Sequence, residues 1–157
     1  MSELADVDGD ADFDVLTAAA KPDRSVLVHT RPNETDIATS STWTTARLPA
    51  PEDEAQYGSP KAIAAADIQG DGDLDVLVAC EEALANASGL YALSRDGAAW
   101  VPADIAGSQG VKFDRLDVID LDGDADVDVL TSEEDVLGVL WYENPGGSSP
   151  RTRPPPA

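Results

Sequence analysis

The chain has 157 residues, of which 42% are hydrophobic, which is enough for one modest domain with a core but not for two large domains. Acidic residues number 31 against 10 basic ones, and the resulting formal net charge of −21 argues against binding to nucleic acids or anionic membranes. The single cysteine, Cys80, excludes an intramolecular disulfide framework and a Cys-rich zinc site. Cations are therefore the partners that the composition favours.

Short β-strands are the predicted elements throughout, because apolar runs alternate or are β-branched and end at Gly, Pro, Asn or Asp. We expect three repeats, near residues 1–61, 62–114 and 115–147. The first holds the end of an inner strand and then strands at 14–18, 25–30 and 42–48. The second holds strands at 62–68, 75–80, 90–94 and 99–105, the last two joined by a turn at 95–97 whose Asp-Gly favours a hairpin. The third holds strands at 115–121, 128–131 and 138–142, and the Pro-rich segment 148–157 is expected to be a disordered tail.

The repeats are recognised by three similar acidic segments of nine residues each. They read DVDGDADFD, DIQGDGDLD and DLDGDADVD, and they begin at Asp6, Asp67 and Asp120, which are 61 and 53 residues apart. Each is followed by Val-Leu. This spacing suits one four-stranded sheet per repeat rather than a short solenoid turn.

Calcium is the cation that these segments predict, because it takes six to eight oxygen ligands and a tight turn can direct several carboxylates inward. We number the segments from 1 to 9 and expect carboxylates from positions 1, 3, 5 and 9 and a backbone carbonyl from position 7. The candidate ligands are Asp6, Asp8, Asp10, Asp12 and Asp14 in the first loop, Asp67, Gln69, Asp71, Asp73 and Asp75 in the second, and Asp120, Asp122, Asp124, Asp126 and Asp128 in the third. So many like charges in one turn are unfavourable unless a cation compensates.

The loops have two other interpretations. Solvated acidic hairpins remain possible, since Asp and Gly favour turns without a metal. An EF-hand is excluded because its loop needs Glu at position 12 and flanking helices, whereas position 12 here is Thr17, Val78 or Thr131. Calcium loops of this kind usually carry Gly at position 6, so Ala11 and Ala125 are expected to be forced left-handed there at a cost on the order of 1 kcal/mol. This strain, and the neutral Gln69 in the second loop, predict weak sites of about 0.1–1 mM affinity.

The three loops, their Val-Leu exits and the ending Trp141-Tyr142-Glu143-Asn144 resemble FG-GAP/VCBS repeats, the blades of integrin-α-type propellers. The resemblance implies a loop between the first and second strands of each blade that binds calcium on one face of the propeller. We therefore expect an all-β fold, a partial β-propeller of about two to two and a half four-stranded antiparallel blades with Asp-rich calcium loops. Open blade edges make self-association an expectation as well.

The sequence contains few of the residues on which enzyme catalysis usually depends. The chain has one histidine, His29, one cysteine and no G-x-S-x-G motif. A carboxylate-only mechanism stays formally open, but calcium accounts for the clustered acids. The pairs Glu81-Glu82 and Glu133-Glu134 are expected to be solvated strand ends, and three tryptophans are expected to pack between blades: Trp43, Trp100 and Trp141.

The expected function is adhesion or protein recognition by a calcium-binding module that is not an enzyme. A carbohydrate-binding propeller and a non-catalytic appendage of a larger secreted enzyme are the alternatives. No stretch approaches the roughly 18 apolar residues of a membrane span, and the N-terminus lacks the features of a signal peptide. Because the chain begins inside a motif, we expect it to be part of a longer extracellular or cell-surface protein.

Overall fold

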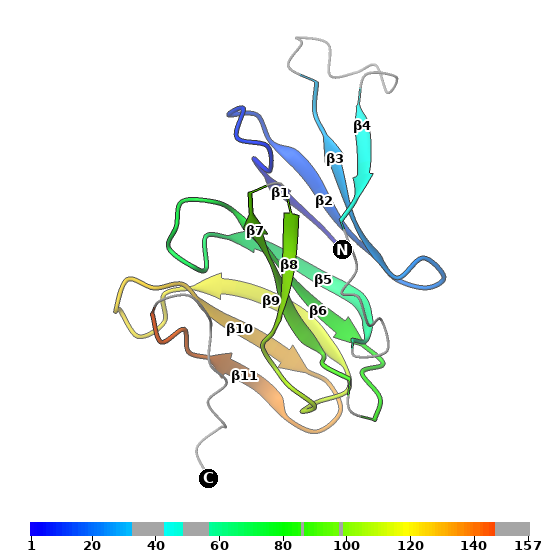
Figure 1. Ribbon diagram of the computed structural model, residues 1–157. Helices are drawn as coiled ribbons and strands as arrows, with labels where there is room; N and C mark the ends of the chain where they lie inside the picture. Colours follow the sequence, from blue (N-terminus) through cyan, green and yellow to red (C-terminus); the bar gives the residue numbers. More distant parts are fainter. Residues whose placement is uncertain (33–42, 49–56, 86, 98, 147–157) are drawn as a thin grey trace.

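The structure is a computed structural model, and it describes residues 1–32, 43–48, 57–85, 87–97 and 99–146. The described residues form eleven strands in three antiparallel sheets (Figure 1). The first sheet contains β1 (Ser2–Ala5), β2 (Asp14–Ala19), β3 (Ser25–Thr30) and β4 (Thr44–Arg47). The second contains β5 (Ser59–Ala66), β6 (Asp75–Glu81), β7 (Leu90–Asp96) and β8 (Ala99–Asp104). The third contains β9 (Phe113–Ile119), β10 (Asp128–Glu133) and β11 (Gly138–Tyr142).

In every sheet, strands that are consecutive in sequence are neighbours in space. The all-β prediction is confirmed, and the described strands form three antiparallel sheets. The predicted strands 62–68 and 115–121 were placed too late, because β5 ends at Ala66 and β9 ends at Ile119. The next residues bond elsewhere: the backbone N–H of Ile68 donates to a carboxylate of the acidic loop, which ends the ladder. Residue 42 of a third predicted strand and the predicted tail at 148–157 lie outside the described residues.

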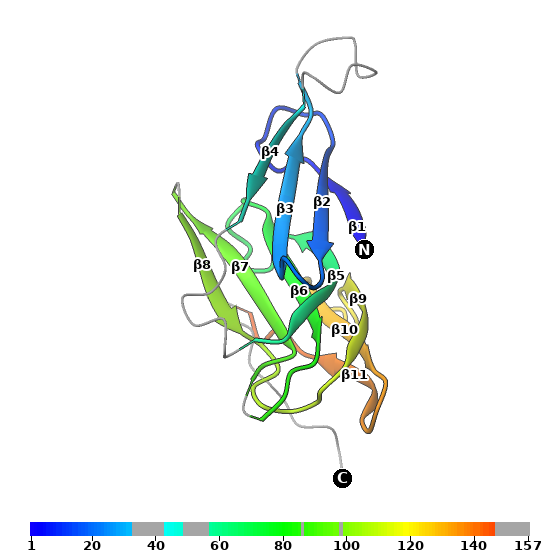
Figure 2. The ribbon, with the colours of Figure 1, turned by 90° about the vertical axis from the view of Figure 1, so that its right-hand side faces the viewer.

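The second sheet lies between the other two, as Figures 1 and 2 show from two directions. Its central strand β6 is buried on both faces, from Asp75 to Cys80. One face packs on the first sheet, where Val76 and Val78 join a cluster with Leu16. The other face packs on the third sheet and forms a second cluster. This uninterrupted apolar run is typical of a strand covered on both sides.

The sheets stack with a constant polarity. We call face A the face that carries the valine after each acidic loop, and face B the face that carries the following leucine. Leu16 on face B of the first sheet shares a cluster with Val76 on face A of the second. Leu77 on face B of the second sheet shares a cluster with Val129 on face A of the third. Face A of the first sheet and face B of the third are therefore the outer faces of the stack.

Glu133 corrects the expectation of two solvated acidic pairs, because it is 2% exposed at the end of β10. Its Oε1 accepts the backbone N–H groups of Val111 and Lys112 at 3.2 Å each. Its Oε2 accepts those of Val136 and Leu137 at 2.7 and 2.8 Å. Burial opposes ionisation, but these four donors outweigh it and lower the pKa of Glu133 to about 2.

Three remaining acids of these pairs are at least partly exposed and contact basic side chains. Glu82 pairs with Lys21 and Arg24 of the first sheet's β2–β3 turn, and Glu134 pairs with Lys112. Glu81 lies 3.2 Å from Lys61, which also contacts Asp114 of the third sheet. In the part of the chain that is described, no helix reaches the length and apolarity that crossing a membrane requires.

Candidate metal sites in the three acidic loops

Each acidic segment connects the first two strands of its sheet: β1 to β2, β5 to β6, and β9 to β10. The three loops follow one another along the same edge of the stack, on the left in Figure 1. The segments are thus structurally equivalent as well as similar in sequence. A shared set of hydrogen bonds fixes their shape, and the carboxylates of positions 1 and 9 provide most of it.

The position-9 aspartates anchor each loop to the following strand. Asp14, Asp75 and Asp128 begin β2, β6 and β10 and are at most 1% exposed. In each, Oδ2 accepts the backbone N–H of position 2, at 3.0 or 3.1 Å. The other oxygen also has a donor, which is the N–H of Arg31, the side-chain amide of Gln69 or the N–H of Asn144. A buried carboxylate needs such partners, so these residues have a structural role whether or not a metal binds.

The position-1 aspartates hold the shape of the turn by accepting hydrogen bonds from its backbone N–H groups. Asp6, Asp67 and Asp120 accept the N–H of position 6 through Oδ2, at 2.8 to 3.1 Å. Their Oδ1 atoms accept an N–H of position 4 or 5. The turn therefore closes around a carboxylate, as in an Asx turn extended by two residues.

Position 6 is left-handed in all three loops, which confirms the expectation of strain there. The φ angles are 72° at Ala11, 93° at Gly72 and 78° at Ala125. An L-residue with a Cβ pays on the order of 1 kcal/mol for this conformation, whereas glycine adopts it freely. The first and third loops therefore keep an unfavourable backbone angle that the second avoids.

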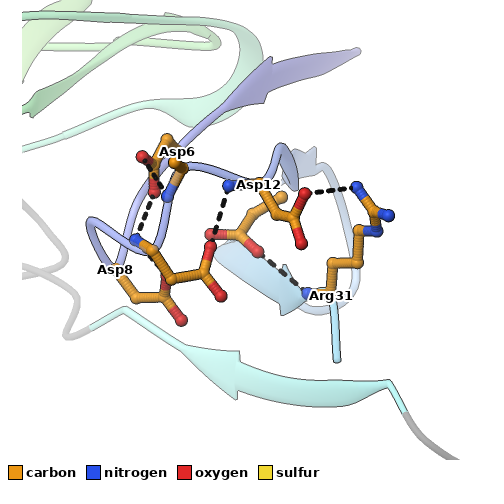
Figure 3. A network of polar contacts seen from close by, with 7 residues as sticks. Asp6, Asp8, Asp12 and Arg31 are labelled. Atoms are coloured by element: carbon orange, nitrogen blue, oxygen red, sulfur yellow. Dashed lines mark hydrogen bonds and ion pairs between the residues drawn. The ribbon is translucent and has the colours of Figure 1, made fainter. Parts of the chain in front are cut away.

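The first and third loops each bring three carboxylates together. Single oxygens of Asp6, Asp8 and Asp14 lie within 4.8 Å of one another, and Figure 3 shows this loop. Oxygens of a second group, within the same distance, belong to Asp120, Asp122 and Asp124. A hard cation such as calcium fits a donor set of this kind. Among the described residues, the second loop does not form a comparable group of three acids.

The remaining candidate ligands have other contacts. Asp12 forms an ion pair with Arg31, whose Nη1 lies 2.8 Å from its Oδ1 (Figure 3). Asp10 accepts the N–H of Asp12, and the pairs Asp71–Asp73 and Asp124–Asp126 repeat that bond at 2.9 to 3.0 Å. A position-7 backbone carbonyl as a calcium ligand, from Asp12, Asp73 or Asp126, stays a prediction. Gln69 donates its amide to Asp75, so its neutral side chain stabilises the loop without adding charge.

The clustered carboxylates repel one another when they are ionised. Desolvation within the loop raises the pKa of Asp8, and the charges of Asp14 and Asp10 raise it further. Desolvation likewise raises the pKa of Asp122, with the charge of Asp124 acting in the same direction. These shifts show that the folded loops hold negative charge at a cost, which a bound cation would remove.

Two side chains that the sequence did not single out as contacts connect one sheet to the acidic loop of its neighbour. Arg95 on β7 donates to the carbonyl of Val7 at 3.1 Å. Asn144, which is 2% exposed, donates to the carbonyl of Ile68 at 2.8 Å. Val7 and Ile68 both occupy position 2 of a loop. The only signal for Asn144 was its place in the Trp-Tyr-Glu-Asn ending, and Arg95 lay in a predicted turn.

The other reactive side chains are placed as the sequence suggested. Cys80 is fully buried, and burial raises the pKa of its thiol to about 12, which makes it unreactive. His29 lies on the outer face of the first sheet, half-buried, with Nδ1 3.0 Å from the hydroxyl of Thr45. Neither belongs to the carboxylate groups.

Comparisons with protein-family models, with curated proteins and with solved structures gave no match. The acidic loops themselves are therefore the basis for assigning a function.

Proposed function

We propose that this chain is a calcium-stabilised module of β-propeller repeats that serves adhesion or protein recognition and does not catalyse a reaction. The observation that carries the proposal is the pair of three-carboxylate groups in equivalent loops. In each loop the backbone is already held by position 1, so the carboxylates are brought together before a metal arrives. Such preorganisation lowers the entropy cost of binding.

Asp6, Asp8 and Asp14 would hold calcium in the first loop, and Asp120, Asp122 and Asp124 in the third. A divalent cation would offset the desolvation, and also the repulsion from neighbouring carboxylates, that raise the pKa of Asp8 and Asp122. Calcium suits these sites better than magnesium, which requires compact octahedral geometry and gives up its water reluctantly. The second loop would bind more weakly, since Gln69 replaces one carboxylate.

The three sheets would be consecutive blades of a partial propeller. Support comes from their meander topology, from face-to-face stacking with one polarity, and from loops that share an edge. Propellers arrange four-stranded sheets radially, with connections of this kind. The likeness of the loops and the Trp-Tyr-Glu-Asn ending to FG-GAP/VCBS repeats points the same way, and it is the basis for the recognition role and an extracellular setting.

Isothermal titration of calcium into chelator-treated protein tests the proposal. We expect two similar sites of about 0.1–1 mM affinity and a weaker third one, with magnesium giving much less heat. Asp122→Asn should remove one of the two similar sites. The matched control is Asp135→Asn, an exposed residue in the β10–β11 turn of the same sheet, which should leave both intact. Absence of calcium binding up to about 10 mM, tenfold above the weakest expected affinity, would refute the metal assignment.

A further inference from the structure

Ladder register places three residues at equivalent positions near the end of the third strand of each sheet. Val15, Val76 and Val129, the valines after the loops, pair with His29, Leu93 and Tyr142. Two residues beyond each partner stand Arg31, Arg95 and Asn144. Since side chains alternate along a strand, Arg95 projects on face A of its sheet. Arg31 and Asn144 stand at the equivalent positions just beyond β3 and β11, where their backbone N–H groups donate to Asp14 and Asp128 in the same way.

Two of these residues connect their own sheet to the acidic loop of the sheet before it. The guanidinium of Arg95 reaches the carbonyl of Val7, and the amide of Asn144 reaches the carbonyl of Ile68. The accepting residue is at position 2 in both cases. Each interface in the stack therefore combines apolar packing of face B on face A with one polar contact from face A to the preceding loop.

The two ends of the stack carry the counterparts of these donor and acceptor residues. Arg31 occupies the position in the first sheet that Arg95 and Asn144 occupy in theirs, and Leu121 is position 2 of the third loop. Arg31 uses Nη1 for the ion pair with Asp12, while its Nε is buried and has no hydrogen bond. Leu121 is 47% exposed and lies between the acidic residues Asp120 and Asp122.

The two outer faces carry exposed apolar side chains that match this arrangement. On face A of the first sheet, Leu4 pairs with Val15 and is 62% exposed. Face B of the third sheet carries Ile119, Val139 and Trp141, which are 46%, 73% and 38% exposed. Their positions correspond to those of residues that pack between sheets elsewhere in the stack. The exposed apolar surface is thus a continuation of the internal interfaces.

We infer that face B of the third sheet binds face A of the first sheet of a second copy of this chain. The stacking is head to tail, and Arg31 of the second copy reaches the third acidic loop as Arg95 reaches the first. Its charge is complementary to that loop. Because the two contact surfaces differ, the interface is heterologous, and association closes into a ring or extends into a chain of copies. This inference concerns the sheet faces and does not depend on calcium binding.

Complementation between two variants tests this arrangement. Leu4→Glu places a charge on face A and leaves face B intact, whereas Val139→Glu does the reverse. Both residues are exposed, so neither change should prevent folding, which circular dichroism checks. Light scattering should show a mass above the monomer's 16.4 kDa for the unaltered chain at tens of micromolar. Each variant alone should be monomeric, and an equimolar mixture should recover a one-to-one complex through the remaining intact pair of faces.

The matched control is Val136→Glu, which adds the same charge at an 83% exposed apolar residue in the β10–β11 turn, away from both faces. It should associate like the unaltered chain. The inference is overturned if the unaltered chain is monomeric at these concentrations, if either variant alone still associates, if the mixture stays monomeric, or if the control variant is monomeric. Continued association of a single variant would indicate pairing of like faces.

Discussion

The guanidinium of Arg95 on β7 donates a hydrogen bond of 3.1 Å to the carbonyl of Val7, in the acidic loop of the neighbouring sheet. The same guanidinium lies over the ring of Trp100, 4.8 Å from its centroid. One guanidinium thus contacts both the outer strand of its own sheet and the acidic loop of the preceding sheet. Arg95→Met should therefore lower the free energy of unfolding by about 1.5 to 3 kcal/mol, the range for hydrogen bonds to charged groups.

Urea denaturation measures this effect. Arg115→Met is the control, because Arg115 is 71% exposed and its only described ion pair is with Asp117 on the same strand. Exposed pairs contribute about 0 to 1 kcal/mol. Equal losses in the two variants would contradict a role for Arg95 between sheets.

Position 6 of the loops offers a test of backbone strain. Ala125→Gly should raise stability by about 0.5 to 1 kcal/mol, because glycine adopts the φ of 78° without penalty but loses more chain entropy on folding. Gly72→Ala should lower it by a similar amount. A Cβ on Gly72 would meet no atom within 4 Å, so that loss reports the backbone angle alone. Thermal unfolding in chelator checks both changes, and shifts of the same sign would contradict the explanation.

Glu133 predicts a loss of stability in acid. Its pKa is about 2 in the folded chain and about 4.3 when unfolded, so the unfolded state binds the proton first as the pH falls. The stabilisation is present above about pH 5 and is lost as the pH approaches 2. Glu133→Gln should cost on the order of 3 kcal/mol at pH 7, since an amide serves four N–H donors poorly.

The pH profile of stability distinguishes this from a packing defect. In Glu133→Gln the slope between pH 5 and 2 should be shallower, since one titrating carboxylate is gone. Glu134→Gln removes a half-exposed carboxylate that pairs with Lys112 and should keep most of the slope. Parallel profiles for Glu133→Gln and the unaltered chain would argue against the proposed pKa.

The second loop differs from the others in having the neutral Gln69, and not an aspartate, at position 3, and it forms no group of three carboxylates among the described residues. Gln69→Asp should give that loop a position-3 carboxylate and strengthen its calcium site. In chelator the same change should lower the melting temperature, because it adds a charge beside Asp75 and removes the amide bond to it. A variant with unchanged calcium response would contradict the assignment of position 3 as a ligand.

The sequence was sufficient for the local features of the fold and less so for its long-range polar contacts. Alternating apolar residues and Asp-Gly turns predicted the strands, and the repeated acidic pattern predicted the left-handed angle at Ala11 and Ala125. The burial of Glu133 was missed because its four donors come from two separate loops, which no local pattern brings together. The contacts of Arg95 and Asn144 were missed for the same reason, since their acceptors lie 88 and 76 residues away in sequence.

The ligand assignments show the same limit. Spacing alone assigned Asp12 a ligand role through its backbone carbonyl, and it did not predict that Arg31 forms an ion pair with the carboxylate of Asp12. Register along β3 determines where Arg31 lies, and register is a property of the folded sheet. Position 9 was expected to supply a ligand in all loops, and that role stays a prediction. Asp14 lies in a carboxylate group and Asp128 does not, and the position-9 carboxylates of all three loops accept protein donors that the sequence did not predict.

The melting temperature in chelator and in about 10 mM calcium, tenfold above the weakest expected affinity, tests the central claim most directly. Each occupied site should add about 1.4 to 2.7 kcal/mol by mass action, and two sites should raise the melting temperature by on the order of 10 °C. Magnesium should give a much smaller rise, Asp124→Asn should reduce the calcium response, and Asp135→Asn should preserve it. Identical melting curves in chelator and in calcium would contradict calcium binding and leave an acidic stack of β-sheets.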